Sequence, residues 1–230
     1  CKEKYSIQGK SKMNKIEKQQ NTPEEQVARE LEEDIIFGRL QPGTRLREDA
    51  LLERFGGTRH FIRQALTRLE RAGIVTHERN RGAKVRSFSS AEVRQVYDVR
   101  ELLQRQAALN IPLPVSPKIV SRLQEINQEY RECIATDNRR GIHENNDVFH
   151  KVFYAACDNP YLTDLIRDYM DITLAIRAKN LADPGLLQVS IAHHDLMIKY
   201  LQGSDNWVLA ELCVEHVRPS KEQYLEMLVD

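Results

Sequence analysis

The stretch from Gly56 to Glu70 constrains this chain more than any other, because it joins a two-glycine turn to a strongly amphipathic helical pattern. Thr58 follows the glycines and can cap the helix by accepting a hydrogen bond from a backbone N–H. Apolar residues recur at helical spacing and predict one buried face: Ile62, Ala65, Leu66 and Leu69. Polar residues share another face: Arg59, His60, Arg63 and Thr67.

A helix of this kind packs on a core with one face and presents guanidinium groups on the other. That arrangement suits a recognition helix in the DNA major groove, since arginine pairs bidentately with guanine edges and phosphates. The same pattern also occurs on ordinary solvated surface helices. The flanking segments therefore decide between the two interpretations.

The segments on either side of this helix favour a winged helix-turn-helix. A capping box with proline at the first helical position begins a helix at 22–25, and Gly38 is expected to end it. A short strand is expected over 44–46, a helix over 48–55, and two strands over 74–77 and 83–86, joined by a basic turn. This order predicts that the third helix enters the major groove while the hairpin reaches phosphates or the minor groove. The expected DNA-contacting residues are Arg45, Thr58, Arg59, His60, Arg63, Arg79, Arg81, Gly82 and Lys84.

Charge is unevenly distributed although the formal net charge is zero. Residues 1–88 carry a net charge of +6 and residues 89–230 a net charge of −6. This asymmetry predicts one nucleic-acid-binding part and one with a different role. We expect a disordered Lys-rich arm over 1–21, the winged helix-turn-helix over 22–88 and a second domain over 89–230.

The second domain is predicted to be entirely helical. Six helices are expected, over about 89–110, 116–136, 142–158, 161–182, 186–202 and 205–227. With no strand signal among them, they predict a six-helix antiparallel bundle. The fold class is therefore mainly α, with a small β-hairpin wing in the N-terminal part.

Hydrophobic residues make up 41% of the chain and charged residues 30%, which is typical of a soluble globular protein. No apolar run is long enough to span a membrane and no signal peptide opens the sequence. A cytoplasmic location without a membrane partner is expected. The four cysteines lack any CxxC spacing, so reduced thiols are expected as well.

Three histidines lie on apolar faces of the expected bundle helices: His150, His194 and His216. Asn146 lies one turn before His150 on the same face. His193 lies off the apolar stripe and is expected to be exposed. A single histidine on such a face is usually a core residue, whereas three on three helices suit Zn²⁺, Mn²⁺ or Ni²⁺.

Arg100 lies on the apolar face of the first bundle helix, where burial would require a partner. It either pairs with a bundle carboxylate, extends to solvent, or acts as a bidentate clamp for the carboxylate of a small acid. Tyr97 on the same helix and Arg177 on another are further candidate effector-binding residues.

Several segments of the N-terminal part carry a specific combination of motifs. The segment 38–46 has the pattern G-x-L-x-P-G-x-x-L, and 57–66 has the pattern G-[ST]-R-x-x-x-R-x-A-L, followed by a matching helix end and wing at 69–75 and 81–85. This combination resembles the GntR family of bacterial transcription regulators. Phe61 and Gln64 depart from the usual Pro and Glu. Ala50 stands where an Arg contacts DNA in the FadR branch, so the operator sequence of that branch is not carried over.

The bundle resembles the FCD domain, the effector-binding half of the FadR branch, in its six-helix, VanR-like type. One segment that carries the resemblance is 146–150, whose sequence N-D-V-F-H is similar to the D-x-x-F-H of that domain. The others are 97–103, 194–205 and 215–216. The resemblance implies a divalent metal (Zn, Ni or Mn) held by Asn146, His150, His194 and His216. Asn146 stands at the usual Asp position, which predicts weaker metal binding. Asp147 lies about 100° round the helix and does not substitute for that Asp.

The resemblance also implies a homodimer that binds operator DNA, acts as a repressor and responds to a small carboxylate metabolite. Two alternatives stay open. In one, a DNA-binding protein has a purely structural dimerisation bundle with ordinary core histidines. In the other, the three histidines serve a metal-dependent enzyme. Against the enzyme, the sequence has no HExxH motif and no obvious carboxylate one turn from a ligand.

Overall fold

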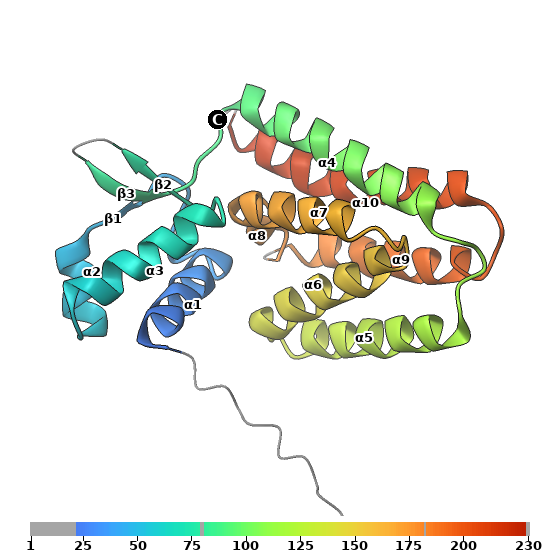
Figure 1. Cartoon of the computed structure of the whole chain (residues 1–230), viewed down its shortest axis with the longest axis horizontal. Coiled ribbons are helices and arrows are strands. Elements are labelled where there is room, and N and C mark those ends of the chain that lie inside the picture. Colours follow the sequence, from blue (N-terminus) through green and yellow to red (C-terminus); the bar gives the residue numbers. More distant parts are fainter. Residues whose placement is uncertain (1–21, 79–80, 182, 229–230) are drawn as a thin grey trace, which may run out of the picture.

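A computed structural model describes residues 22–78, 81–181 and 183–228, which form an N-terminal unit packed against a helical bundle (Figure 1). The N-terminal unit contains α1 (Pro23–Ile36), β1 (Arg45–Leu46), α2 (Glu48–Phe55), α3 (Arg59–Arg71), β2 (Val75–Glu78) and β3 (Gly82–Val85). The bundle contains α4 (Ser90–Asn110), α5 (Pro117–Ala135), α6 (Arg139–Ala155), α7 (Pro160–Ile172), α8 (Leu174–Asn180), α9 (Pro184–Tyr200) and α10 (Asn206–Glu226). The predicted arm over 1–21 and the hairpin residue Arg79 lie outside the described residues.

The N-terminal unit has the predicted order of helices and strands. Its three strands form an antiparallel sheet in the order β1-β3-β2, with Arg45 opposite Lys84. Apolar side chains of α1, α3 and the sheet pack into one core. Gly57 has a φ of 79°, and this left-handed conformation lets the chain turn sharply into α3. The winged helix-turn-helix expected from the sequence is therefore confirmed.

The bundle is also helical throughout its described residues, as predicted. Figure 1 shows α4 lying along α10, and α5 lying along α6. Proline at the first turn begins α5, α7 and α9, where a missing N–H costs nothing. The main core lies between these helices and includes the stacked rings of Phe149 and Phe153. The chain is mainly α with a small sheet, which confirms the predicted fold class.

The helix predicted over 161–182 is divided into α7 and α8 at Thr173. Thr173 is fully buried, and its hydroxyl donates to the carbonyl oxygens of Tyr169 and Met170. A threonine hydroxyl that bonds its own helix in this way competes with the regular backbone pattern and bends the helix. Residue periodicity alone could not reveal the break, because both halves keep their apolar faces inward.

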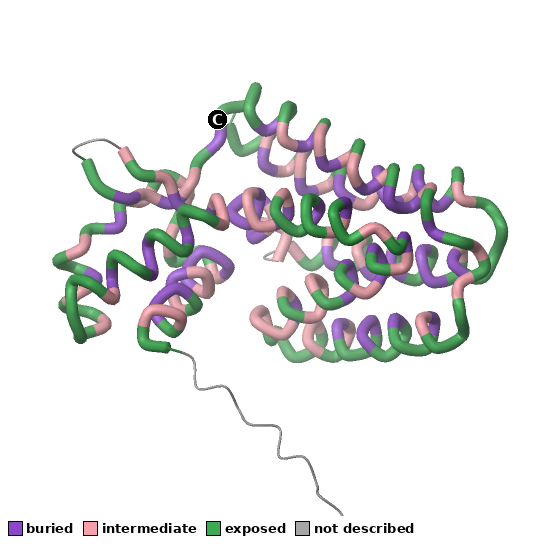
Figure 2. Tube along the Cα trace, in the orientation of Figure 1, coloured by how far each residue is buried: buried purple, intermediate pink, exposed green. Residues whose placement is uncertain are grey.

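The short helix α8 joins the two units. Leu174 and Ala175 belong to the core of the N-terminal unit, whereas Ile176 packs with Phe88 and Tyr97 in a cluster between α4 and α10. Figure 2 shows buried residues along α8, where it lies between the units. The helix therefore contributes side chains to both cores.

Ion pairs support the same junction from outside. Arg29 of α1 lies 3.2 Å from Glu144 of α6, and Arg140 of α6 lies 3.0 Å from Glu33 of α1. Because these four side chains are partly exposed, each pair contributes little stability, on the order of 1 kcal/mol or less.

No helix in the described part of the chain combines the length and the apolar character needed to cross a bilayer. The cysteines at 133, 157 and 213 are free thiols.

Candidate nucleic-acid interface and histidine-lined cavity

The polar face of α3 is open to solvent. Thr58 caps the helix by accepting a hydrogen bond from the Phe61 N–H at 3.3 Å. The side chains of Arg59 and Arg63 are 58% and 64% exposed, so both can reach a ligand. Carboxylates of α2 pair with them: Asp49 lies 2.7 Å from Arg59, and Glu48 lies 2.9 Å from the Nε of Arg63. Each of the two arginines is thus held by a carboxylate of α2.

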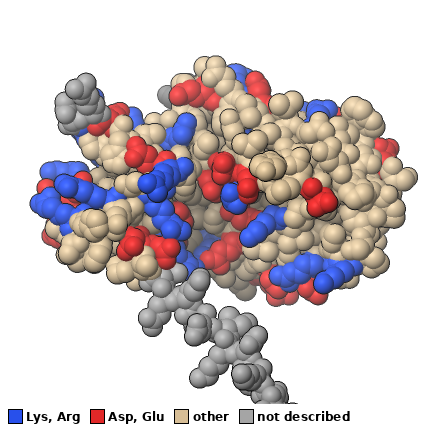
Figure 3. All heavy atoms as spheres, viewed as in Figure 1, with Lys and Arg blue, Asp and Glu red and all other residues tan. Residues whose placement is uncertain are grey.

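The other predicted DNA contacts surround this face. His60, Arg45, Arg81 and Gly82 are exposed. Lys84 is only partly exposed and pairs with Glu78 within the sheet. Figure 3 shows Lys and Arg gathered on the N-terminal unit at the side farthest from the bundle. This unit therefore presents a basic surface around the N-terminal half of α3.

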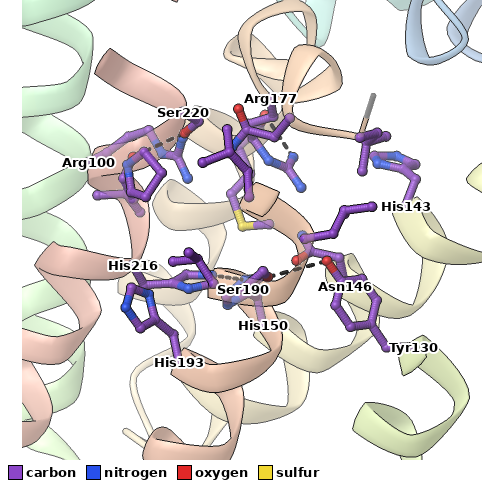
Figure 4. A pocket seen from close by; sticks show the side chains of 18 of the residues that line it. Arg100, Tyr130, His143, Asn146, His150, Arg177, Ser190, His193, His216 and Ser220 are labelled. Atoms are coloured by element: carbon purple, nitrogen blue, oxygen red, sulfur yellow. Dashed lines mark hydrogen bonds between the residues drawn. The ribbon is translucent and has the colours of Figure 1, made fainter. Parts of the chain in front are cut away.

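The bundle encloses a cavity of about 70 Å³ between its helices (Figure 4). Its polar lining includes Arg100, Arg177, Asn146, Ser190 and several histidines. Its apolar lining includes Met170, Leu187 and Val217. A cavity of this size accepts a small molecule only, since sites for drug-sized ligands measure about 300 Å³ or more.

The three predicted histidines come together beside this cavity. One ring nitrogen from each of His150, His194 and His216 lies within 4.8 Å of the other two. The Nε2 atoms of His150 and His216 are 3.1 Å apart. Two nitrogens bound to one metal at about 2.1 Å would be about 3.0 to 3.4 Å apart. The spacing of these two atoms matches that of two ligands of one cation.

Burial keeps the three imidazoles neutral. Burial lowers the pKa of His150 to about 3, and the nearby Arg177 guanidinium acts in the same direction. Burial and the neighbouring histidines lower the pKa of His194 and His216 well below the usual value. The neutral form is the one that offers a lone pair to a metal or to a hydrogen-bond donor.

The residues around the histidines supply an amide but no carboxylate. Asn146 lines the same cavity one turn from His150 (Figure 4). Asp147 instead pairs with Arg177 and lies 3.5 Å from the Nε2 of His143. Asp147 is not part of the three-histidine group, which among the described residues contains no carboxylate.

Arg100 is buried with only 4% of its surface exposed. Its Nη1 donates to the Thr173 hydroxyl at 3.1 Å, and the ring of Tyr97 lies 4.9 Å from its guanidinium carbon. Its Nε has no hydrogen-bond partner among the described residues. The carboxylate partner considered for Arg100 is not found there, and the side chain does not extend to solvent. A guanidinium group therefore lines the cavity without a neutralising anion from the described chain.

Two matches to family models cover most of the chain. Residues 23–85 match the family described as bacterial regulatory proteins, gntR family, and residues 95–219 match the FCD domain. The chain belongs to the GntR family. Its N-terminal unit is the DNA-binding domain of that family, and its bundle is an FCD domain.

Relatives across the GntR family are similar over most of their length. The HTH-type transcriptional repressor RspR of Escherichia coli K12 is 22% identical over 198 residues, covering 86% of this chain and 87% of that protein. The gluconate operon transcriptional repressor of Bacillus licheniformis is 26% identical, covering 78% and 75%. The solved structure of E. coli McbR/YncC has the same fold, with a TM-score of 0.69, 20% identity and coverage of 91% and 98%. These relatives are transcription regulators, and this GntR member is a DNA-binding regulator rather than an enzyme.

The FCD cavity contains residues that the helical patterns did not identify. His193, expected to be exposed, lines the cavity, and its ring centre lies 5.6 Å from that of His216. The expectation was wrong because α10 covers more of α9 than the apolar face of that helix. The neighbouring side of α9, which includes His193, also lies near α10. Tyr97 is fully buried behind Arg100, and its hydroxyl lies 2.7 Å from that of Ser220. Tyr97 therefore supports Arg100 and does not line the cavity.

Proposed function

We propose that this GntR regulator is a cytoplasmic homodimeric repressor that a small organic acid releases from its operator. The acid binds in the FCD cavity together with a divalent metal ion. The observation that carries this proposal is the buried guanidinium group of Arg100, which faces the cavity without an anionic partner among the described residues.

A carboxylate supplies what Arg100 lacks. A buried charge without a partner is costly, and burial lowers the pKa of Arg100, which shows how unfavourable its charged form is there. A bidentate carboxylate would restore the missing charge and hydrogen bonds. Arg177 adds a second cation to the lining, although Asp147 already neutralises it. The small volume limits the acid to a few carbon atoms.

The histidine group fits a divalent cation. His150 and His216 provide neutral nitrogen donors 3.1 Å apart, and a third nitrogen, from His194, lies within 4.8 Å of both. Asn146 provides an amide oxygen in the lining of the adjacent cavity. Zn²⁺ and Ni²⁺ suit imidazole ligands, and Mn²⁺ accepts them when oxygen ligands complete the set. A bound ion would add positive charge to the site. It would also offer free coordination positions to the oxygen atoms of a ligand.

Repression and dimerisation rest on the relatives and on the geometry of DNA recognition. RspR and the gluconate operon protein are repressors by name, which supports the same role here. Helix-turn-helix proteins bind two half-sites about one helical turn apart, which requires two copies of α3. An acid that favours one spacing of those helices would change operator affinity.

The test combines metal analysis with ligand screening. Protein purified without chelator is analysed for Zn, Ni and Mn, and its molar mass is measured by light scattering; a dimer has twice the chain mass of 26.7 kDa. Acetate, lactate and pyruvate are screened by thermal shift. The acids that bind are then added to a complex of the protein with a duplex that it has selected from a random library. At least one acid should stabilise the protein and weaken duplex binding.

A matched pair of variants assigns the effect to the cavity. Arg100→Gln should abolish the thermal shift, whereas Arg105→Gln, on the exposed side of the same helix, should keep it. Absence of metal, together with no shift from any acid, would instead support a purely structural dimerisation bundle.

A further inference from the structure

A chain of polar contacts leads from the protein surface to the buried histidines. His194 of α9 is fully buried, and its Nδ1 lies 3.1 Å from the Oδ1 of Asn127 on α5. The Nδ2 of Asn127, which is itself 3% exposed, donates to Asp195 at 2.8 Å. Asp195 in turn pairs with Arg131 at a surface groove between α5 and α9.

Each link in this chain fixes the orientation of the next. A carboxylate only accepts hydrogen bonds, so the amide nitrogen of Asn127 must face Asp195. The amide oxygen of Asn127 must then face His194. An oxygen acceptor at Nδ1 requires that Nδ1 carry the hydrogen of the neutral ring, which leaves a lone pair on Nε2.

The Nε2 of His194 has no hydrogen-bond partner in the described part of the chain. Its ring lies beside those of His150 and His216, with ring centres 5.3 and 5.0 Å away. A lone pair in this position can bind a cation or accept a hydrogen bond from an N–H or O–H group. It repels a carboxylate oxygen. We therefore expect the carboxylate of a ligand to lie near Arg100, and a cation or a hydrogen-bond donor to lie at the histidines.

We propose that Asn127 and Asp195 are positioning residues that hold His194 as the Nδ1–H tautomer and aim its Nε2 at the histidine group. The tautomer follows from the contacts of the protein alone. Its consequence, tighter metal binding, rests on the metal site proposed above. An exposed aspartate thus sets the state of a fully buried ligand through one intervening amide.

The tautomer is measured without any metal. Long-range ¹H–¹⁵N correlation spectra of the ¹⁵N-histidine-labelled, chelator-treated full chain distinguish the two neutral tautomers. His194, identified by its loss in His194→Gln, should give the Nδ1–H pattern. In Asp195→Asn the amide of Asn127 is free to rotate, and His194 should give a mixture of both tautomers. Glu129→Gln removes the same charge from an exposed position on α5 and should leave the spectrum unchanged.

Metal binding gives a second measurement. Asn127→Leu removes the partner of Nδ1 and should weaken Zn²⁺ binding, measured by competition with a chromogenic chelator, by roughly 10- to 100-fold. Combining Asn127→Asp with Asp195→Asn exchanges the carboxylate and the amide, keeps an acceptor facing His194 and should restore most of that affinity. Circular dichroism checks that each variant keeps its helical content.

The outcomes separate this proposal from the metal site. An Nε2–H pattern for His194 in the unaltered protein would overturn the proposal, and an unchanged pattern in Asp195→Asn would remove Asp195 from the positioning chain. The expected tautomer in a protein that binds no Zn²⁺ would support the positioning role and reject the metal site.

Discussion

Arg63 projects from α3 with its Nε directed at Glu48, so the pair with α2 uses the side of the guanidinium group and not its end. The terminal nitrogens are the ones that pair with a guanine edge or a phosphate. The contacts of Glu48 therefore orient Arg63 for recognition and add little stability, since the pair is exposed.

The first prediction concerns this side chain. Arg63→Ala should weaken binding to the selected duplex by about 1 to 3 kcal/mol if Arg63 contacts a base, and should lower the salt dependence by about one charge if it contacts a phosphate. Fluorescence anisotropy titrations at several salt concentrations measure both quantities. Arg122→Ala, on the exposed face of α5, serves as the control and should change neither.

The second prediction concerns Asn146. Asn146→Asp adds an anionic oxygen to a group of neutral donors, and ligand charge is a strong determinant of cation affinity. Zn²⁺ affinity should rise about tenfold or more in competition titrations, while acid binding should weaken because the cavity becomes less positive. Gln124→Glu adds the same charge on exposed α5 and should leave both affinities unchanged. Equal Zn²⁺ affinity in Asn146→Asp and the unaltered protein would show that Asn146 lies outside the coordination sphere.

At the scale of single elements, the division between α7 and α8 depends on the Thr173 hydroxyl. This hydroxyl bonds the carbonyl of Tyr169 and also accepts from Arg100, so it joins the helix break to the cavity lining. The break at Thr173 gives α8 a direction different from that of α7. As a result, Leu174 lies in the core of the N-terminal unit and Arg177 lines the FCD cavity.

The third prediction follows from that hydroxyl. Thr173→Val leaves the buried Arg100 Nη1 without its acceptor and should lower the free energy of unfolding by about 1 to 3 kcal/mol in urea titrations. Thr173→Ser keeps the hydroxyl and removes one methyl group, so it should cost about 1 kcal/mol. A serine variant as unstable as the valine variant would assign the effect to packing.

At the scale of the whole molecule, the junction between the units contains two acidic side chains with raised pKa values, Glu32 and Asp171. Burial raises the pKa of Glu32 on α1 to about 7, and Asp171 across the junction adds to the shift. Asp147 and Glu33 raise this pKa further, whereas Arg68 opposes the shift. Burial raises the pKa of Asp171 to about 6 as well.

The fourth prediction is a pH dependence at this junction. Because the folded state holds a proton on Glu32 more tightly than the unfolded state, stability should fall as pH rises from about 4.5 to about 7. Glu32→Gln removes this loss, so its melting temperature should exceed that of the unaltered protein at pH 8 and equal it near pH 4.5. At pH 8 the free energy of unfolding of Glu32→Gln should exceed that of the unaltered protein by on the order of 1 to 2 kcal/mol. Glu53→Gln, at an exposed position on α2, should show no such pH-dependent difference.

Helical periodicity predicted much of this architecture, because it identifies which face of each helix is buried. It placed His150, His194 and His216 on buried faces, and the structure brings them together. Periodicity does not identify the neighbour that a face meets. The position of His193 and the break at Thr173 depend on contacts with other helices, and such contacts leave no signal in the local sequence.

The insertion of Leu174 and Ala175 into the core of the N-terminal unit affects how this protein can be engineered. A fragment that ends at residue 88 lacks both side chains, so the DNA-binding domain is not a self-contained cassette. Chimeric regulators that exchange whole N-terminal regions would create a mismatched gap wherever the recipient helix differs at these two positions. Operator preference is better transplanted by exchanging only the solvent-facing residues of α3, with the recipient's own junction left intact.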